Sequence, residues 1–166
     1  MKRECLDKLL EWKGRSNRKP LILRGARQVG KTWLLKEFAR TAYNKCAYVN
    51  FEQDRAMRGI FESTLDPLKI LETISLRLKM AIDTDTLIIL DEIQAAPGGI
   101  TALKYFCESA PQYHVVAAGS LLGIAMHRGD SFPVGKVEYI DLYPLSFREF
   151  LMACGDERLV QLIEAG

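Results

Sequence analysis

A glycine-rich stretch of eight residues constrains this chain more than any other feature of its sequence. It reads Gly25-Ala-Arg-Gln-Val-Gly-Lys-Thr32 and matches the pattern G-x-x-x-x-G-K-[ST] in full. It follows the apolar run Leu21–Leu23 and precedes an amphipathic stretch that extends to Ala42. A chance match would seldom fall between strand-forming and helix-forming residues. We therefore interpret the stretch as a functional loop between a strand and a helix.

The residue types in this loop suit a phosphate group. Gly25 and Gly30 allow a tight turn and a close approach of the main chain, so that successive N–H groups point at the anion. The first turn of the next helix adds free N–H donors and the positive end of its dipole. Lys31 would neutralise the β- and γ-phosphates, and the Thr32 hydroxyl would ligate magnesium. The predicted nucleotide-binding residues are Gly25, Ala26, Arg27, Gln28, Val29, Gly30, Lys31, Thr32 and Trp33.

A second motif follows the clearest strand-forming segment of the chain. Thr86–Leu90 is apolar on both faces, as expected for a central strand of a parallel sheet, and leads into Asp91 and Glu92. Parallel strands deliver their C-terminal residues to the crevice where ligands bind. Asp91 is therefore predicted to hold magnesium together with Thr32, and Glu92 to polarise the attacking water. A solvated acidic turn is the alternative explanation for such a pair.

The acidic pair also favours ATP over GTP. A hydrolytic ATPase commonly carries Asp-Glu at this point, whereas a GTPase needs D-x-x-G and N-K-x-D motifs. Asp91–Gln94 does not match the first of these motifs, and Asn44–Ala47 lacks the aspartate of the second. The predicted cofactors are ATP and Mg²⁺.

Short apolar runs alternate with longer amphipathic runs along the chain. This order predicts right-handed β-α-β crossovers and an α/β fold. We expect the three-layer sandwich of a P-loop NTPase, with a central parallel five-stranded sheet and helices on both faces. The predicted strands are Leu21–Leu23, Cys46–Phe51, Thr86–Leu90, Tyr113–Ala118 and Lys136–Leu142. Helices are predicted at 30–42, 57–61, 67–82 and 100–109, and again after Ser146.

Composition is that of an ordinary globular protein. A chain of 166 residues with 48% hydrophobic and 27% charged residues can bury a sizeable core as one domain. A net charge of +2 does not predict a nucleic-acid-binding face. We interpret the basic cluster as a solvated linker; its members are Lys13, Arg15, Arg18 and Lys19. Neither a signal peptide nor a transmembrane segment is predicted, so we expect a cytoplasmic protein.

Cysteine and histidine spacing predicts no metal centre. The four cysteines are scattered and have no histidine at ligand spacing, so we expect buried thiols in a reducing compartment. They are Cys5, Cys46, Cys107 and Cys154. His114 and His127 stand alone and are expected to be structural.

Taken together, these motifs resemble those of AAA+ ATPases. More narrowly, the chain is similar to a prokaryotic AAA-domain family of predicted ATPases, whose members usually continue into a C-terminal domain of uncharacterised function. The matching segments are 24–32, 90–94, 118–122, 131–136 and 143–150. They read R-G-A-R-Q-V-G-K-T, L-D-E-I-Q, A-G-S-L-L, S-F-P-V-G-K, and Y-P-L-S-F followed by E-F.

The resemblance implies roles for three further residues. Ser120 stands where AAA+ proteins place sensor 1, which reads the γ-phosphate or the attacking water; a helix N-cap is its alternative role. Arg128 is a candidate arginine finger for a neighbouring subunit, which implies a possible homo-oligomer, or it is a solvated loop residue. Arg27 either contacts the nucleotide or braces the loop. The predicted catalytic residues are Glu92, Lys31, Ser120 and Arg128.

A complete AAA+ module also carries a small helical lid, and only a short helical pattern at 156–163 is present here. We therefore expect residues 1–166 to form one ATP-binding core, an N-terminal fragment that lacks most of the lid and the following domain. Its predicted activity is Mg-dependent ATP hydrolysis that remodels an unidentified macromolecular partner, either protein or nucleic acid. A nucleotide-dependent switch and a small-molecule kinase are the alternatives, and the acidic pair favours the ATPase.

Overall fold

A five-stranded parallel sheet forms the centre of the protein. The computed structural model describes residues 3–120, 133–155, 159 and 161. The strands lie in the order β2-β3-β4-β1-β5, and every neighbouring pair is parallel. Their bounds are β1 Leu21–Gly25, β2 Lys45–Asn50, β3 Thr86–Asp91, β4 His114–Ser120 and β5 Glu138–Leu142.

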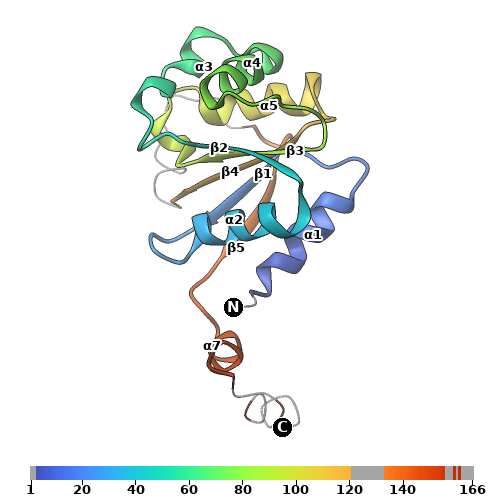
Figure 1. Cartoon of the computed structure of the whole chain (residues 1–166), viewed down its shortest axis with the longest axis vertical. Helices are drawn as coiled ribbons and strands as arrows, with labels where there is room; N and C mark the ends of the chain where they lie inside the picture. Colours follow the sequence, from blue (N-terminus) through green and yellow to red (C-terminus); the bar gives the residue numbers. More distant parts are fainter. Residues whose placement is uncertain (1–2, 121–132, 156–158, 160, 162–166) are drawn as a thin grey trace.

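Helices cover both faces of this sheet, which confirms the predicted α/β sandwich (Figure 1). One layer holds α1 and α2, and the other holds α3, α4 and α5 (Figure 1). The helices are α1 Cys5–Gly14, α2 Lys31–Ala42, α3 Ile60–Ser63, α4 Pro67–Leu78, α5 Gly99–Ser109 and α7 Phe147–Cys154, with 3₁₀ turns η1 Arg55–Met57 and η2 Ile93–Ala95. The last helix, α7, lies outside both layers, after β5 (Figure 1). In the described part of the chain, no helix combines the length and apolar character needed to cross a bilayer.

Successive residues of the buried strands contribute to two separate cores. In β3, Leu87 and Ile89 pack in the core beneath α1 and α2, whereas Ile88 and Leu90 pack in the core beneath α4 and α5. Side chains in a strand alternate between faces with a period of two, so a strand covered on both sides must be apolar throughout. Burial of both faces therefore fixes where each strand ends along the sheet. It thereby also fixes the position of the residues that follow the strands.

Helix α1 is an element that the sequence analysis did not predict. Its buried residues are Cys5, Leu9 and Trp12, and Leu6 and Leu10 lie beside them on the apolar side of the segment. The Trp12 ring lies edge-on to Phe38 of α2 at 6.4 Å between centroids, and its Nε1 donates to the Lys19 carbonyl at 2.8 Å. The helix therefore completes the layer that contains α2.

The basic cluster spans the last turn of α1 and the connection to β1, where its cations are exposed or half-buried, as expected for a solvated linker, and they also bond neighbouring segments. Lys13 donates to the Ala42 carbonyl at the end of α2, and Arg15 pairs with Glu138 of β5. Arg18 donates to the Gln112 carbonyl at 3.2 Å. Lys19 donates to the Gly135 carbonyl at 2.7 Å. The four cations connect the start of β1 to loops and strands that are distant in sequence.

Two further expectations are corrected by the structure, and two others fall on residues that it does not describe. Helix α4 ends at Leu78 rather than near Ile82, because Lys79 adopts a left-handed conformation with φ 52°. The thiols are not uniformly buried: Cys5 is buried, Cys46 and Cys107 are half-buried, and Cys154 is exposed. His127, and the helical pattern at 156–163 apart from residues 159 and 161, lie outside the described residues.

We predict that Trp12→Ala destabilises the protein by about 3–5 kcal/mol, because it leaves a cavity between α1, α2 and the sheet. Leu10→Ala is the matched control, since Leu10 lies in the same helix and is exposed; its cost should stay below about 1 kcal/mol. Urea denaturation followed by circular dichroism measures both. Equal costs for the two variants would contradict the assigned packing of α1.

We predict that His114 makes stability fall as the pH drops from about 6.5 to about 4. Its Nδ1 is hydrogen-bonded to the Tyr43 hydroxyl at 2.6 Å, and burial, with Arg18 and Lys13, lowers its pKa to about 4 from 6.5. The unfolded chain then binds more protons than the native chain across this range, so the free energy of unfolding decreases with acid. His114→Phe should remove this part of the pH dependence. Denaturation at several pH values would show parallel curves for both proteins if His114 had no such role.

Candidate functional site

The predicted phosphate loop connects the carboxyl end of β1 to the first turn of α2. A Cβ atom at Gly25 would lie 2.5 Å from the Leu142 carbonyl oxygen and 3.0 Å from a Val29 methyl carbon. Only glycine therefore fits between the loop and β5. Gly30 has φ 93° and Gln28 has φ 65°, both in the left-handed region. The loop thus curls tightly just before α2 begins at Lys31.

Lys31 is folded back into the loop. Its Nζ donates to the carbonyl oxygens of Gly25 at 3.0 Å and of Ala26 at 2.7 Å. Burial lowers the pKa of Lys31, an effect that Glu92 and Asp91 partly offset by stabilising the ammonium. The charge is therefore held inside the loop and close to both carboxylates.

Asp91 is the polar centre of the site and is fully buried. Its Oδ2 accepts hydrogen bonds from the Thr32 hydroxyl at 2.8 Å and from the Tyr48 hydroxyl at 2.7 Å. Asn50 Nδ2 lies 3.4 Å from the same oxygen. Burial raises the pKa of Tyr48 to about 12, so its hydroxyl remains a donor to Asp91 at neutral pH. Two strands and the first turn of α2 thereby converge on one carboxylate.

Glu92 follows Asp91 in a left-handed conformation, with φ 52° and ψ 46°. A non-glycine residue in this region is uncommon and strained. The turn lets the Glu92 N–H bond Asp91 Oδ1 at 3.1 Å, and the Gln94 amide donates to Glu92 Oε2. The side chain thus lines the hollow beside the phosphate loop rather than continuing the strand.

Two hollows border the loop. The first has a volume of about 460 Å³. It is lined by Arg27, Gln28, Gly30, Lys31, Thr32, Trp33, Glu52 and Glu92. It therefore contains the loop lysine, the magnesium-binding threonine of the prediction and the predicted water-polarising glutamate together.

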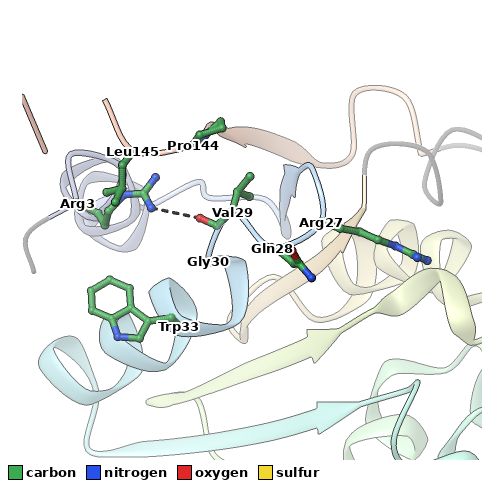
Figure 2. A pocket seen from close by; sticks show the side chains of 8 residues that line it. All are labelled: Arg3, Arg27, Gln28, Val29, Gly30, Trp33, Pro144 and Leu145. Atoms are coloured by element: carbon green, nitrogen blue, oxygen red, sulfur yellow. Dashed lines mark hydrogen bonds between the residues drawn. The ribbon is translucent and has the colours of Figure 1, made fainter. Parts of the chain in front are cut away.

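The second hollow lies on the other side of the loop and has a volume of about 430 Å³. Arg3, Val29, Pro144 and Leu145 line it, and Arg27, Gln28, Gly30 and Trp33 are shared with the first hollow. Figure 2 shows Trp33 at the start of α2, with Arg3 and Leu145 across the hollow from it and Val29 and Gly30 beside it, while Arg27 points away from Arg3 and Trp33. The chain that leaves β5 therefore forms part of the wall.

The remaining predicted residues are Ser120, Arg128 and Arg27, and the structure describes the first and the last of them. Ser120 is the last residue of β4, is buried, and pairs in register with Gly25. It therefore lies at the same edge of the sheet as the loop. Arg128, and the segment that Ser120 was expected to cap, lie outside the described residues. Arg27 is exposed and lines both hollows.

Sequence reasoning missed several residues of this site. Asn50 ends β2 and Glu52 follows it at the same sheet edge, and the rule that parallel strands end together could have located them. Tyr48 contacts Asp91 but belongs to no motif used above. Gln94 belongs to the motif L-D-E-I-Q, but no role was assigned to it there. Arg3 carries no local signal, because it contacts the loop from a distance of 26 residues in sequence.

The donor set fits a magnesium ion better than a transition metal. Mg²⁺ takes oxygen ligands and is commonly held by one or two protein groups together with phosphate oxygens and waters. Thr32 Oγ1 and Asp91 Oδ2 are two oxygens that already lie 2.8 Å apart. Among the described residues, no group of three or more histidines, cysteines, aspartates or glutamates could enclose a metal.

Comparison with solved structures shows this fold in a protein of low sequence identity. A structure of Drosophila ORC bound to DNA matches with a TM-score of 0.56 and 17% identity, over 95% of this chain and 47% of that chain. Pif1 helicase from Candida albicans and PCH-2 from C. elegans each have a TM-score of 0.44. Their identities are 14% and 16%, over 96% and 95% of this chain and 42% and 45% of theirs. This chain thus spans about half the length of these proteins.

Sequence comparison gives a family assignment but no individual relative. No curated protein matches the chain significantly. A protein-family model described as "AAA domain" matches residues 17–151. This range begins just after α1, ends within α7, and includes the whole sheet and the loop residues that line the two hollows. With its five-stranded parallel sheet and the loop at 25–32, the chain belongs to this AAA domain family.

Proposed function

We propose that this domain binds ATP with Mg²⁺ at the loop Gly25–Thr32 and hydrolyses the γ-phosphate. The observation that carries the proposal is the 2.8 Å contact between Thr32 Oγ1 and Asp91 Oδ2. It brings the helix that follows a phosphate loop against the acidic end of the central strand. Lys31 and Glu92 line the same hollow, so the groups needed to bind and to cleave a triphosphate lie together.

The loop and its lysine would hold the phosphates. Lys31 would exchange its contacts with the Gly25 and Ala26 carbonyls for phosphate oxygens, which carry more negative charge. Thr32 and Asp91 would bind Mg²⁺, which when present neutralises charge on the phosphates. Tyr48 would orient the Asp91 carboxylate through its hydroxyl.

Glu92 would orient and polarise the attacking water. Its backbone turn directs the side chain into the hollow that also contains Lys31 and Thr32. Ser120, at the same sheet edge, would read the γ-phosphate. Arg128 would act as an arginine finger toward a neighbouring copy, which makes a homo-oligomer part of the proposal.

The nucleobase would occupy the second hollow. That hollow adjoins Gly30 at the start of α2 and offers the partly exposed Trp33 ring and the apolar pair Pro144 and Leu145. Aromatic and apolar surfaces suit the flat face of a base. The phosphates and the base would then lie on either side of the loop residues that both hollows share.

ATP turnover would serve to remodel a macromolecular partner, either protein or nucleic acid, in the cytoplasm. A second candidate function is a nucleotide-dependent switch with little turnover. One observation favours it: the Gln94 amide holds the Glu92 carboxylate, and the same carboxylate must be free to orient water. Phosphate release by the wild type and by Glu92→Gln separates these functions.

Lys31→Ala is expected to weaken Mg-ATP binding about 10- to 100-fold, because it removes charge-assisted bonds to phosphate. Isothermal titration calorimetry measures the dissociation constant. Lys36→Ala is the matched control, since Lys36 lies on the same helix and is exposed, above the Tyr48 ring. Unchanged affinity in Lys31→Ala would show that the loop is not the phosphate site.

Glu92→Gln is expected to bind ATP normally but to release phosphate about 100-fold more slowly or worse, because the amide cannot accept a proton from water. Single-turnover phosphate release measures the step. Glu52→Gln is the control, as the other glutamate that lines the same hollow, and should keep wild-type turnover within a few-fold. Wild-type turnover in Glu92→Gln would refute the assignment, and a wild type that binds ATP without any turnover would support the switch.

A further inference from the structure

Arg3 is one of the most buried charged side chains in the described chain, at 4% exposure, and it contacts three separate segments. Its Nε donates to Glu149 Oε1 at 3.0 Å. Its Nη1 donates to the Val29 carbonyl at 3.2 Å and its Nη2 to the Tyr143 carbonyl at 2.7 Å. One guanidinium thus joins the start of α1, the phosphate loop, the chain after β5 and helix α7.

Glu149, the partner of Arg3, accepts hydrogen bonds on both of its carboxylate oxygens. Its Oε1 also accepts from the Glu4 N–H at 3.0 Å, and its Oε2 accepts from the Ser146 N–H at 2.9 Å. This second bond belongs to the capping box that starts α7. Burial by itself would raise the pKa of Glu149, but the two backbone N–H groups and Arg3 outweigh it and lower that pKa. The Glu149 carboxylate is therefore charged, and its bond with Nε fixes the orientation of the Arg3 guanidinium.

The contact with Val29 acts on the loop backbone. A peptide unit is planar and trans, so its C=O and N–H point in opposite directions. Arg3 holds the Val29 oxygen, as Figure 2 shows, and the Gly30 N–H of the same peptide must then point away from Arg3. Glycine can adopt many φ values, so the φ of 93° at Gly30 is one of several orientations open to this peptide. By bonding the Val29 carbonyl, Arg3 selects the orientation in which the Gly30 N–H, and not the carbonyl, points away from α1.

We propose that Arg3 is a positioning residue for nucleotide binding: it orients the Val29–Gly30 peptide and, through Glu149, couples the occupied phosphate loop to the docking of α7. This inference rests on the proposed function. Arg3 bonds the Val29 carbonyl and also lines the hollow proposed for the base, and we assign its effect to the peptide that it holds. The inference also assigns a role to Glu149, whereas the same segment contributes only Pro144 and Leu145 to the proposed nucleotide site.

Breaking the unit should weaken nucleotide binding and uncouple α7. Arg3→Gln and Glu149→Gln are each expected to weaken ADP binding about tenfold, within the range of 5- to 150-fold typical of coupled sites. The double variant should be no weaker than Arg3→Gln alone, because both changes disrupt the same unit. Arg3→Lys is a milder variant that keeps the charge, yet one ammonium cannot span all three acceptors.

Glu4→Gln is the matched control. It removes a carboxylate from an exposed pair with Arg148, between the same two segments as the buried pair, and it should leave ADP affinity within twofold. Calorimetry on residues 1–166 gives the affinities, and thermal unfolding verifies that each variant is folded. Hydrogen exchange adds a readout that a purely structural role would not move: ADP should slow exchange in 147–154 in the wild type and in Glu4→Gln, but not in Arg3→Gln or Arg3→Lys.

The outcomes separate the two proposals. If the wild type does not bind ADP, the proposed function fails and the positioning role fails with it. If the wild type binds ADP and the Arg3 variants match Glu4→Gln in affinity and in exchange at α7, only the positioning role is overturned. Tenfold weaker binding without the loss of α7 protection would overturn the coupling to α7.

Discussion

The contact between the Thr32 hydroxyl and the Asp91 carboxylate joins two elements that lie 59 residues apart, and the rest of the site depends on it. It forms only if β1 and β3 end at the same edge of the sheet. β4 lies between them and is in register with both, pairing Gly25 with Ser120 and Asp91 with Ala118. Because both sheet faces are buried, a slip of a strand would turn apolar residues toward the wrong core. Packing of the two cores thus fixes the distance between Thr32 and Asp91, where a metal-bound phosphate would have to fit.

Most polar groups of the site bond to one another, although the buried Gln94 Oε1 has no hydrogen-bond partner in the described part of the chain. Lys31 bonds loop carbonyls, Asp91 accepts from three side chains, and the Gln94 amide holds Glu92. Buried polar groups without partners are costly, which explains why the site is internally bonded. Nucleotide binding would then exchange contacts, with phosphate oxygens replacing the loop carbonyls at Lys31. The net affinity is a difference between two sets of hydrogen bonds, and small shifts of the loop backbone change it.

Arg3 extends this dependence to the other side of the loop. A buried ion pair adds little net stability, because desolvation offsets the attraction between the charges, but it specifies one arrangement of the groups around it. The pair of Arg3 with Glu149 specifies how the Val29 peptide, the chain after β5 and α7 meet. The loop is thereby held from both sides: by β3 through Asp91, and by the N-terminal segment through Arg3.

The sequence by itself determined the α/β class, the five strands and the phosphate loop, because each is encoded in a local pattern: a period of two or 3.6 residues, or eight consecutive residues. The sequence analysis did not predict α1, although its apolar residues recur at helical spacing, or the end of α4 at Leu78. Only the tertiary structure decided which groups surround Asp91 and which residue holds Val29. Those contacts join residues from 26 to 59 positions apart, and pairings at that range are set by how whole elements pack, which no local pattern records.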